Sequence, residues 1–175
     1  HYSRTLFPSY HEQPPLLFGL EAIFFKLLGD SIYVERIYGL CVTLATMRLI
    51  VLLWKSLLKD DLRRTGWLPL ALWLCVPVSF WSFANNMEEP TMCLFDLAAV
   101  LFMVKAMKGD RHEYLDLFIS AVLLIAASLC KGVQGLFPLR GILLHGLVFR
   151  ERPMHRIVLK TLFVAAVVLV FYGLL

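Results

Sequence analysis

Long apolar runs recur along this chain, and short polar segments separate them. Hydrophobic residues make up 59% of the 175 positions and charged residues only 17%. Soluble domains have about 45–50% hydrophobic residues and about 25% charged residues. A water-facing surface cannot hide this apolar excess, so lipid must be the solvent for most side chains. The sequence therefore predicts an all-α, polytopic transmembrane helical bundle embedded in a lipid bilayer.

The apolar runs predict five spans and the start of a sixth. Pro77 is expected to kink the second span, and Pro138 and Arg140 interrupt the fifth. The expected spans cover residues 31–54, 67–83, 90–107, 115–129, 136–149 and 161–175. Residues 150–160 are expected to form a basic loop before the sixth.

A shorter apolar stretch, residues 16–28, precedes the first span. As a helix it would reach only about 20 Å, short of the ~30 Å hydrocarbon core. Pro15 suits its first turn and Gly29 its C-terminal end. This stretch is therefore predicted to be a short interfacial helix near the N-terminus.

Polar residues at the ends of the runs predict where helices begin. Asp30 and Ser31 are candidate N-caps for the first span, and Pro90 suits the first position of the third. Asp110 and Glu113 have the spacing of a capping box before the fourth span.

Basic residues alternate between the two sides of the predicted bundle. Segments 55–66, 105–114 and 150–160 hold four, three and four Lys or Arg residues, whereas 84–90 and 130–135 hold zero and one. The positive-inside rule makes the basic side cytoplasmic. The other polar turns then share the external face.

The basic residues flank membrane spans and do not cover one soluble face, which argues against nucleic acid as a partner.

The four cysteines are widely separated, lie in or beside apolar runs, and form no CxxC motif. Buried thiols are therefore expected, and neither a metal site nor a disulfide framework is predicted from them.

Three residues of the external turns are candidates for binding a substrate. Glu88 and Glu89 precede Pro90, where a carboxylate either caps the helix or faces a site that orients a hydroxyl or a cation. Lys131 is the one cation of these turns, and it suits either a lipid headgroup or a substrate phosphate.

Two further positions carry polar groups near or within the membrane. Glu12 and Gln13 stand before Pro14-Pro15, which favours an extended backbone at the interface. Arg140 lies at nominal membrane depth, where an unpaired charge costs about 2.5–3.5 kcal/mol, so it should face a partner or a polar cavity.

The segment Glu12-Gln13-Pro14-Pro15-Leu16, the apolar stretch ending at Gly29, and Glu35-Arg36 resemble the polyprenyl-phosphate-sugar-dependent glycosyltransferases of the C-type superfamily. This superfamily includes protein O-mannosyltransferases and the lipid A aminoarabinose transferase. The acidic turn before Pro90 and the Lys131-Gly132 turn also look like this family.

The resemblance implies one transmembrane glycosyltransferase domain, of which residues 1–175 form a part. It would lie in a bacterial inner membrane with its active face outside. Its expected partners are a polyprenyl-phosphate-linked sugar and an acceptor lipid, glycan or protein. The residues do not demand a cofactor, and a divalent cation between phosphate and carboxylates is left open.

The resemblance also implies roles for single positions. Glu12 matches the acid of the Pro-Pro motif near the donor, and Gln13 stands where the aminoarabinose transferase has a phosphate-contacting Lys. Glu89 takes the place of an Asp before Pro, and Lys131 matches the Lys of the Lys-Gly turn, with Arg140 as a second candidate for the phosphate. The family's catalytic Asp would lie upstream of His1, so no catalytic residue is assigned within this chain.

A transporter or channel subunit is the alternative, with Arg48, Lys131 and Arg140 lining a substrate path. The absence of a detectable internal repeat argues against the transporter. A scaffolding membrane subunit without chemistry is a third alternative, and the clustering of polar residues on one face argues against it.

Overall fold

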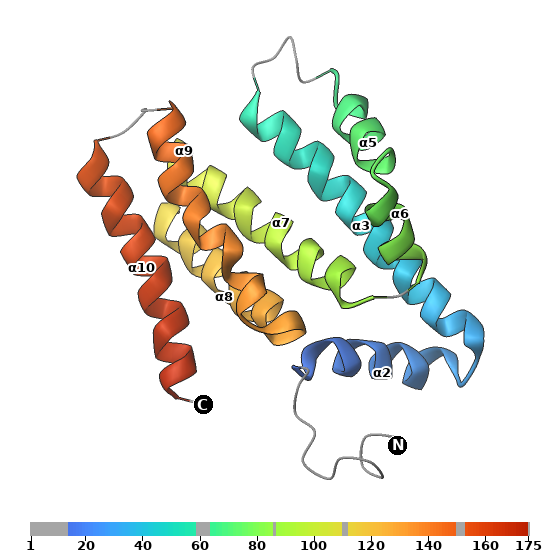
Figure 1. Ribbon diagram of the computed structural model, residues 1–175. Coiled ribbons are helices and arrows are strands. Elements are labelled where there is room, and N and C mark those ends of the chain that lie inside the picture. Colours follow the sequence, from blue (N-terminus) through green and yellow to red (C-terminus); the bar gives the residue numbers. More distant parts are fainter. Residues whose placement is uncertain (1–13, 59–63, 86, 110–111, 150–152, 175) are drawn as a thin grey trace.

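The computed structural model describes residues 14–58, 64–85, 87–109, 112–149 and 153–174, which are helical almost throughout. Helix α2 (Leu16–Leu28) lies across one end of a bundle formed by the longer helices (Figure 1). The all-α bundle expected from the apolar runs is confirmed.

Helices α2 and α3 (Ile32–Leu57) follow the local signals closely. Helix α2 has the predicted bounds, and Gly29 ends it with φ of +88°, a conformation that glycine adopts without steric cost. The Ser31 hydroxyl caps α3 by accepting a hydrogen bond of 3.3 Å from the Tyr33 amide. Helix α3 ends three residues beyond the predicted Trp54.

The predicted second span is two helices rather than one kinked helix. Helix α5 (Trp67–Leu74) ends before Pro77, and α6 (Pro77–Ala84) begins at that proline. Val76 is extended, with φ −82° and ψ 111°, because the proline ring disfavours helical backbone in the residue before it. Proline also lacks the amide that would continue α5.

Helices α7 (Glu88–Lys108) and α8 (Glu113–Lys131) pack side by side at the centre of the bundle (Figure 1). Their shared core includes the fully buried Ala99, Ala106 and Ala121. Small residues let membrane helices approach closely, where van der Waals packing replaces the hydrophobic drive. Pro90 is the third residue of α7, not the first as predicted. Asp110 of the expected capping box lies outside the described residues.

The chain reverses at Gly132, whose φ of +72° and ψ of −150° suit glycine almost exclusively. The next segment, η1 (Gly132–Arg140), is a 3₁₀ helix that continues into α9 (Gly141–Phe149). A Cβ atom on Gly135 would lie 2.3 Å from the Ala127 carbonyl carbon, so η1 packs directly on the α8 backbone. The fifth span therefore begins four residues earlier than predicted.

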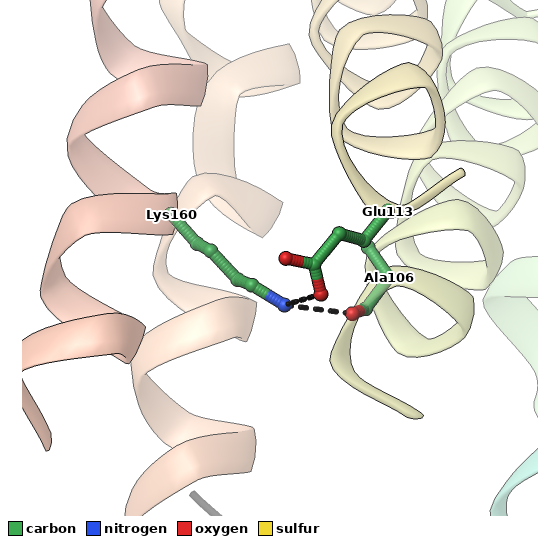
Figure 2. A network of polar contacts seen from close by, with 3 residues as sticks. All are labelled: Ala106, Glu113 and Lys160. Atoms are coloured by element: carbon green, nitrogen blue, oxygen red, sulfur yellow. Dashed lines mark hydrogen bonds and ion pairs between the residues drawn. The ribbon is translucent and has the colours of Figure 1, made fainter. Parts of the chain in front are cut away.

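Helix α10 (Met154–Gly173) corrects the prediction of a basic loop at 150–160. Lys160 lies in its buried stripe with Ile157, Val164 and Val168, at helical spacing. Its ammonium donates to the Glu113 carboxylate at 2.9 Å and to the Ala106 carbonyl at 2.8 Å (Figure 2). The lysine is therefore buried because α8 and α7 supply its partners.

Four helical stretches of the described residues are long and apolar enough to cross a membrane. They cover Ile32–Leu57, Glu88–Lys108, Glu113–Val148 and Met154–Gly173, and the third includes the reversal at Gly132. The protein is thus an integral, multi-pass membrane protein. In Figure 1, the Lys131–Gly132 turn and the end of α10 lie at the same end of the bundle as α2.

Candidate functional site

A cavity of about 490 Å³ lies where α2 meets the ends of α7 and α8. Its lining comes from three parts of the chain: α2, the residues on either side of the α6–α7 turn, and the last residue of α8. The residues are Leu17, Phe18, Glu21, Asn85, Met87, Glu88, Glu89 and Lys131. Cavities of this size typically hold small-molecule ligands.

An ion pair between Glu89 and Lys131 lies in the wall of this cavity. The Lys131 ammonium donates a hydrogen bond to Oε1 of Glu89, and the side chains are 27% and 40% exposed, respectively. Glu89 stands in the first turn of α7 and Lys131 ends α8. Because α7 and α8 are antiparallel neighbours, residues 42 positions apart meet at one end of the bundle.

The cavity is acidic. Three carboxylates, Glu21, Glu88 and Glu89, line it with a single ammonium, Lys131, among the described residues. Such a lining favours hydroxyl groups and cations, while the lysine provides one point of attraction for an anion. The pairing with Glu89 holds the ammonium over the cavity and leaves it further N–H donors for a ligand.

Sequence reasoning placed Glu88, Glu89 and Lys131 on the same face of the membrane, and the structure brings them to one cavity. Glu12 and Gln13 lie outside the described residues. Glu21 was not predicted as a site residue, although an acid in a mostly apolar interfacial helix, where Lys26 is the other charged residue, was a signal for it.

Arg140 lines a different cavity, of about 680 Å³, between α7, η1 and α9. The lining is mostly apolar and includes the exposed side chains of Phe137, Leu144 and Leu147. Asp96 lines it too, eight residues into α7 and therefore about 12 Å from the Glu88 end of that helix. Asp96 and Arg140 thus line the same apolar cavity.

Sequence reasoning missed Asp96, although an acid inside an apolar span is a functional-site signal in itself. Its Oδ1 atom is buried and makes no hydrogen bond with any residue of the described ranges. Removing a buried polar group that has no hydrogen-bond partner relieves the free-energy cost of its desolvation. Removing one member of a hydrogen-bonded pair instead leaves the other member unsatisfied and lowers stability.

We expect Asp96→Leu to raise the free energy of unfolding by roughly 2 kcal/mol, because a carboxylate is costly at membrane depth. Unfolding in mixed detergent micelles measures this change. Asp116→Leu, in the first turn of α8, is the control and should change stability by less than about 0.5 kcal/mol. A loss of stability in Asp96→Leu would contradict the expectation and show that the carboxylate is paired.

Among the described residues, no group of three or more His, Cys, Asp or Glu side chains is placed to hold a metal ion.

Sequence reasoning did not name four further polar residues, which are Tyr38, Thr91, Ser128 and Tyr172. They form hydrogen bonds between helices, at the ends of α7 and α8 that carry Glu89 and Lys131.

The family model of the dolichyl-phosphate-mannose-protein mannosyltransferases matches residues 12–174. The chain belongs to this family. No curated protein and no solved structure gives a significant match.

Membership in the mannosyltransferase family supports glycosyl transfer from a polyprenyl-phosphate sugar as the general chemistry. The matched region begins at Glu12 and includes both cavities. The resemblance inferred from the Pro-Pro motif and the Lys-Gly turn is therefore confirmed at the level of the family. The transporter alternative has no comparable support.

Proposed function

We propose that the protein transfers a sugar, with mannose as the first candidate, from a polyprenyl-phosphate carrier to an acceptor hydroxyl on the external face of the membrane. The observation that carries this proposal is the Glu89–Lys131 pair in the wall of an acidic cavity, in a chain of the mannosyltransferase family. The clustering of basic residues at the opposite end supports the external placement.

In the proposed reaction, a general base takes the proton of the acceptor hydroxyl, and the hydroxyl oxygen attacks the anomeric carbon. The bond between that carbon and the phosphate oxygen breaks, and the polyprenyl phosphate leaves with the electron pair. Lys131 stabilises the charge on the departing phosphate. Glu88 and Glu21 accept hydrogen bonds from sugar hydroxyls, for which the acidic lining is suited.

The carrier's hydrocarbon chain is assigned to the second cavity. Helix η1 starts next to Lys131 and ends at Arg140, so it leads from the proposed phosphate position to the apolar cavity. The exposed Phe137 and Leu144 place the cavity lining within reach of lipid.

Transfer of radiolabelled mannose from polyprenyl phosphomannose, in native membranes containing the protein, tests the proposal. We expect a labelled acceptor that is absent when the protein is absent. Uptake of the labelled sugar into sealed vesicles without any covalent product would identify a transporter instead. Loss of transfer in EDTA and its return with Mg²⁺ or Mn²⁺ would add a divalent cation between the phosphate and the carboxylates.

A further inference from the structure

Two tyrosine hydroxyls form hydrogen bonds between helices, one beside each member of the Glu89–Lys131 pair. The Tyr38 hydroxyl of α3 lies 2.7 Å from Oγ1 of Thr91, which stands two residues after Glu89 in α7. The Tyr172 hydroxyl of α10 donates a hydrogen bond of 2.6 Å to Oγ of Ser128, which stands three residues before Lys131 in α8. Each bond is therefore a brace that ties an outer helix to the helix end that carries one of the two charged residues.

The brace from α3 is buried and rigidly held. Tyr38 is 4% exposed and Thr91 is 1% exposed. The Tyr38 ring also packs edge-on against Phe24 of α2, with 5.2 Å between the ring centroids. Tyr38 and Leu17 belong to one small core, and Leu17 lines the cavity. Tyr38 thus connects the α2 wall of the cavity to the first turn of α7.

The brace from α10 continues into the α8 backbone. Ser128 accepts from Tyr172 and donates to the Ile125 carbonyl at 2.7 Å. Ser128 is 1% exposed, so water offers its hydroxyl no alternative partner. The last turn of α8, which carries Lys131, is therefore fixed by a bond from α10.

Both braces act at helix ends, where backbone hydrogen bonds are incomplete and fraying is easiest. A hydrogen bond between membrane helices contributes little to overall stability on average. Its loss should therefore change the geometry at the helix end more than the stability of the fold. Small displacements of a charged group in a catalytic site can reduce rates strongly.

We propose that Tyr38 and Tyr172 are positioning residues that hold the ends of α7 and α8 so that Glu89 and Lys131 stay in contact in the cavity wall. The consequence for sugar transfer rests on the proposed function, but the positioning itself does not.

The direct test uses a carbodiimide, which joins a carboxylate to an amine in contact with it as an amide. Mass spectrometry of the digested protein measures the Glu89–Lys131 product. We expect Tyr38→Phe and Tyr172→Phe, which remove only the hydroxyl oxygen, each to lower its yield about three-fold or more. The Glu113–Lys160 product is the internal control, because that pair lies in contact at 2.9 Å on other parts of the helices.

Tyr114→Phe is the matched control variant, because Tyr114 is an exposed tyrosine in the first turn of α8, at the opposite end from Lys131. It should leave the Glu89–Lys131 yield unchanged. Unchanged yields in both Tyr38→Phe and Tyr172→Phe would overturn the proposal. So would an equal fall in both cross-links, because this would show general loosening of the fold.

Transfer kinetics provide the second measurement. We expect Tyr38→Phe to lower kcat/KM about ten-fold in the wild-type background but less than two-fold in a Glu89→Gln background, because it acts through Glu89. Equal effects in both backgrounds would contradict that route. If the wild type shows no transfer while the cross-link still falls in the tyrosine variants, the proposed function fails and the positioning role stands.

Discussion

Replacing Lys131 with alanine should lower the rate of sugar transfer by about 100-fold or more. The loss of one preorganised group that stabilises developing charge typically costs about 10²–10³ in kcat. Lys131 is the one ammonium among the described residues of the acidic cavity, so no described neighbour can replace it. Transfer from polyprenyl phosphomannose under saturating donor measures the effect.

The pattern of kinetic constants distinguishes a role in the reaction from a role in donor affinity. If Lys131 stabilises the leaving phosphate, kcat falls much more than KM rises. Glu89→Gln should be milder, at roughly ten-fold, because the amide keeps an oxygen acceptor for the ammonium while losing the charge. Lys105→Ala, an exposed lysine in the last turn of α7, is the control and should retain full activity. Transfer by Lys131→Ala at more than half the wild-type rate would remove Lys131 from the site.

The second large effect concerns stability at the opposite end of the bundle. Lys160→Met should lower the free energy of unfolding by about 3 kcal/mol, at the lower end of the range for breaking a buried ion pair. The lysine side chain is 4% exposed, and its loss leaves the Glu113 carboxylate and the Ala106 carbonyl without this partner. Glu113 is 28% exposed, and the water it reaches limits the loss.

Unfolding in mixed detergent micelles measures this loss. The double variant Glu113→Gln with Lys160→Met should be more stable than Lys160→Met alone, because it also removes the carboxylate charge that the Lys160 ammonium balances. Lys105→Met is again the control, with an expected change below about 0.5 kcal/mol. If Lys160→Met is no less stable than Lys105→Met, the ion pair does not hold α10 against α7 and α8.

Local signals predicted those parts of the fold that depend on neighbouring residues. Pro15 and Gly29 bound α2 as expected, and Ser31 caps α3, because each acts through its own backbone or the nearest turn. The start of α10 was missed because it depends on a residue that is distant in the sequence. Lys160 looked like a loop residue, and its charge is tolerated only because Glu113, 47 positions earlier, lies against it.

In the candidate site, too, sequence signals predicted some features, whereas helix packing determines the others. Charge bias indicated that Glu89 and Lys131 lie at one end of the membrane, but their contact depends on how α7 and α8 pack. Arg140 was grouped with Lys131 in the sequence, whereas the reversal at Gly132 and the course of η1 carry it to the cavity of Asp96. Packing of this kind leaves no mark on residue spacing.

The 3₁₀ winding of η1 also determines how far a short segment can reach. Helices η1 and α9 have nine residues each, and at about 2.0 Å and 1.5 Å per residue they extend about 31 Å together. The same residues wound entirely as an α-helix would reach about 27 Å, close to the shortest length that crosses the ~30 Å hydrocarbon core. The 3₁₀ winding thus adds about 4 Å of reach to one of the shorter crossings of the bundle.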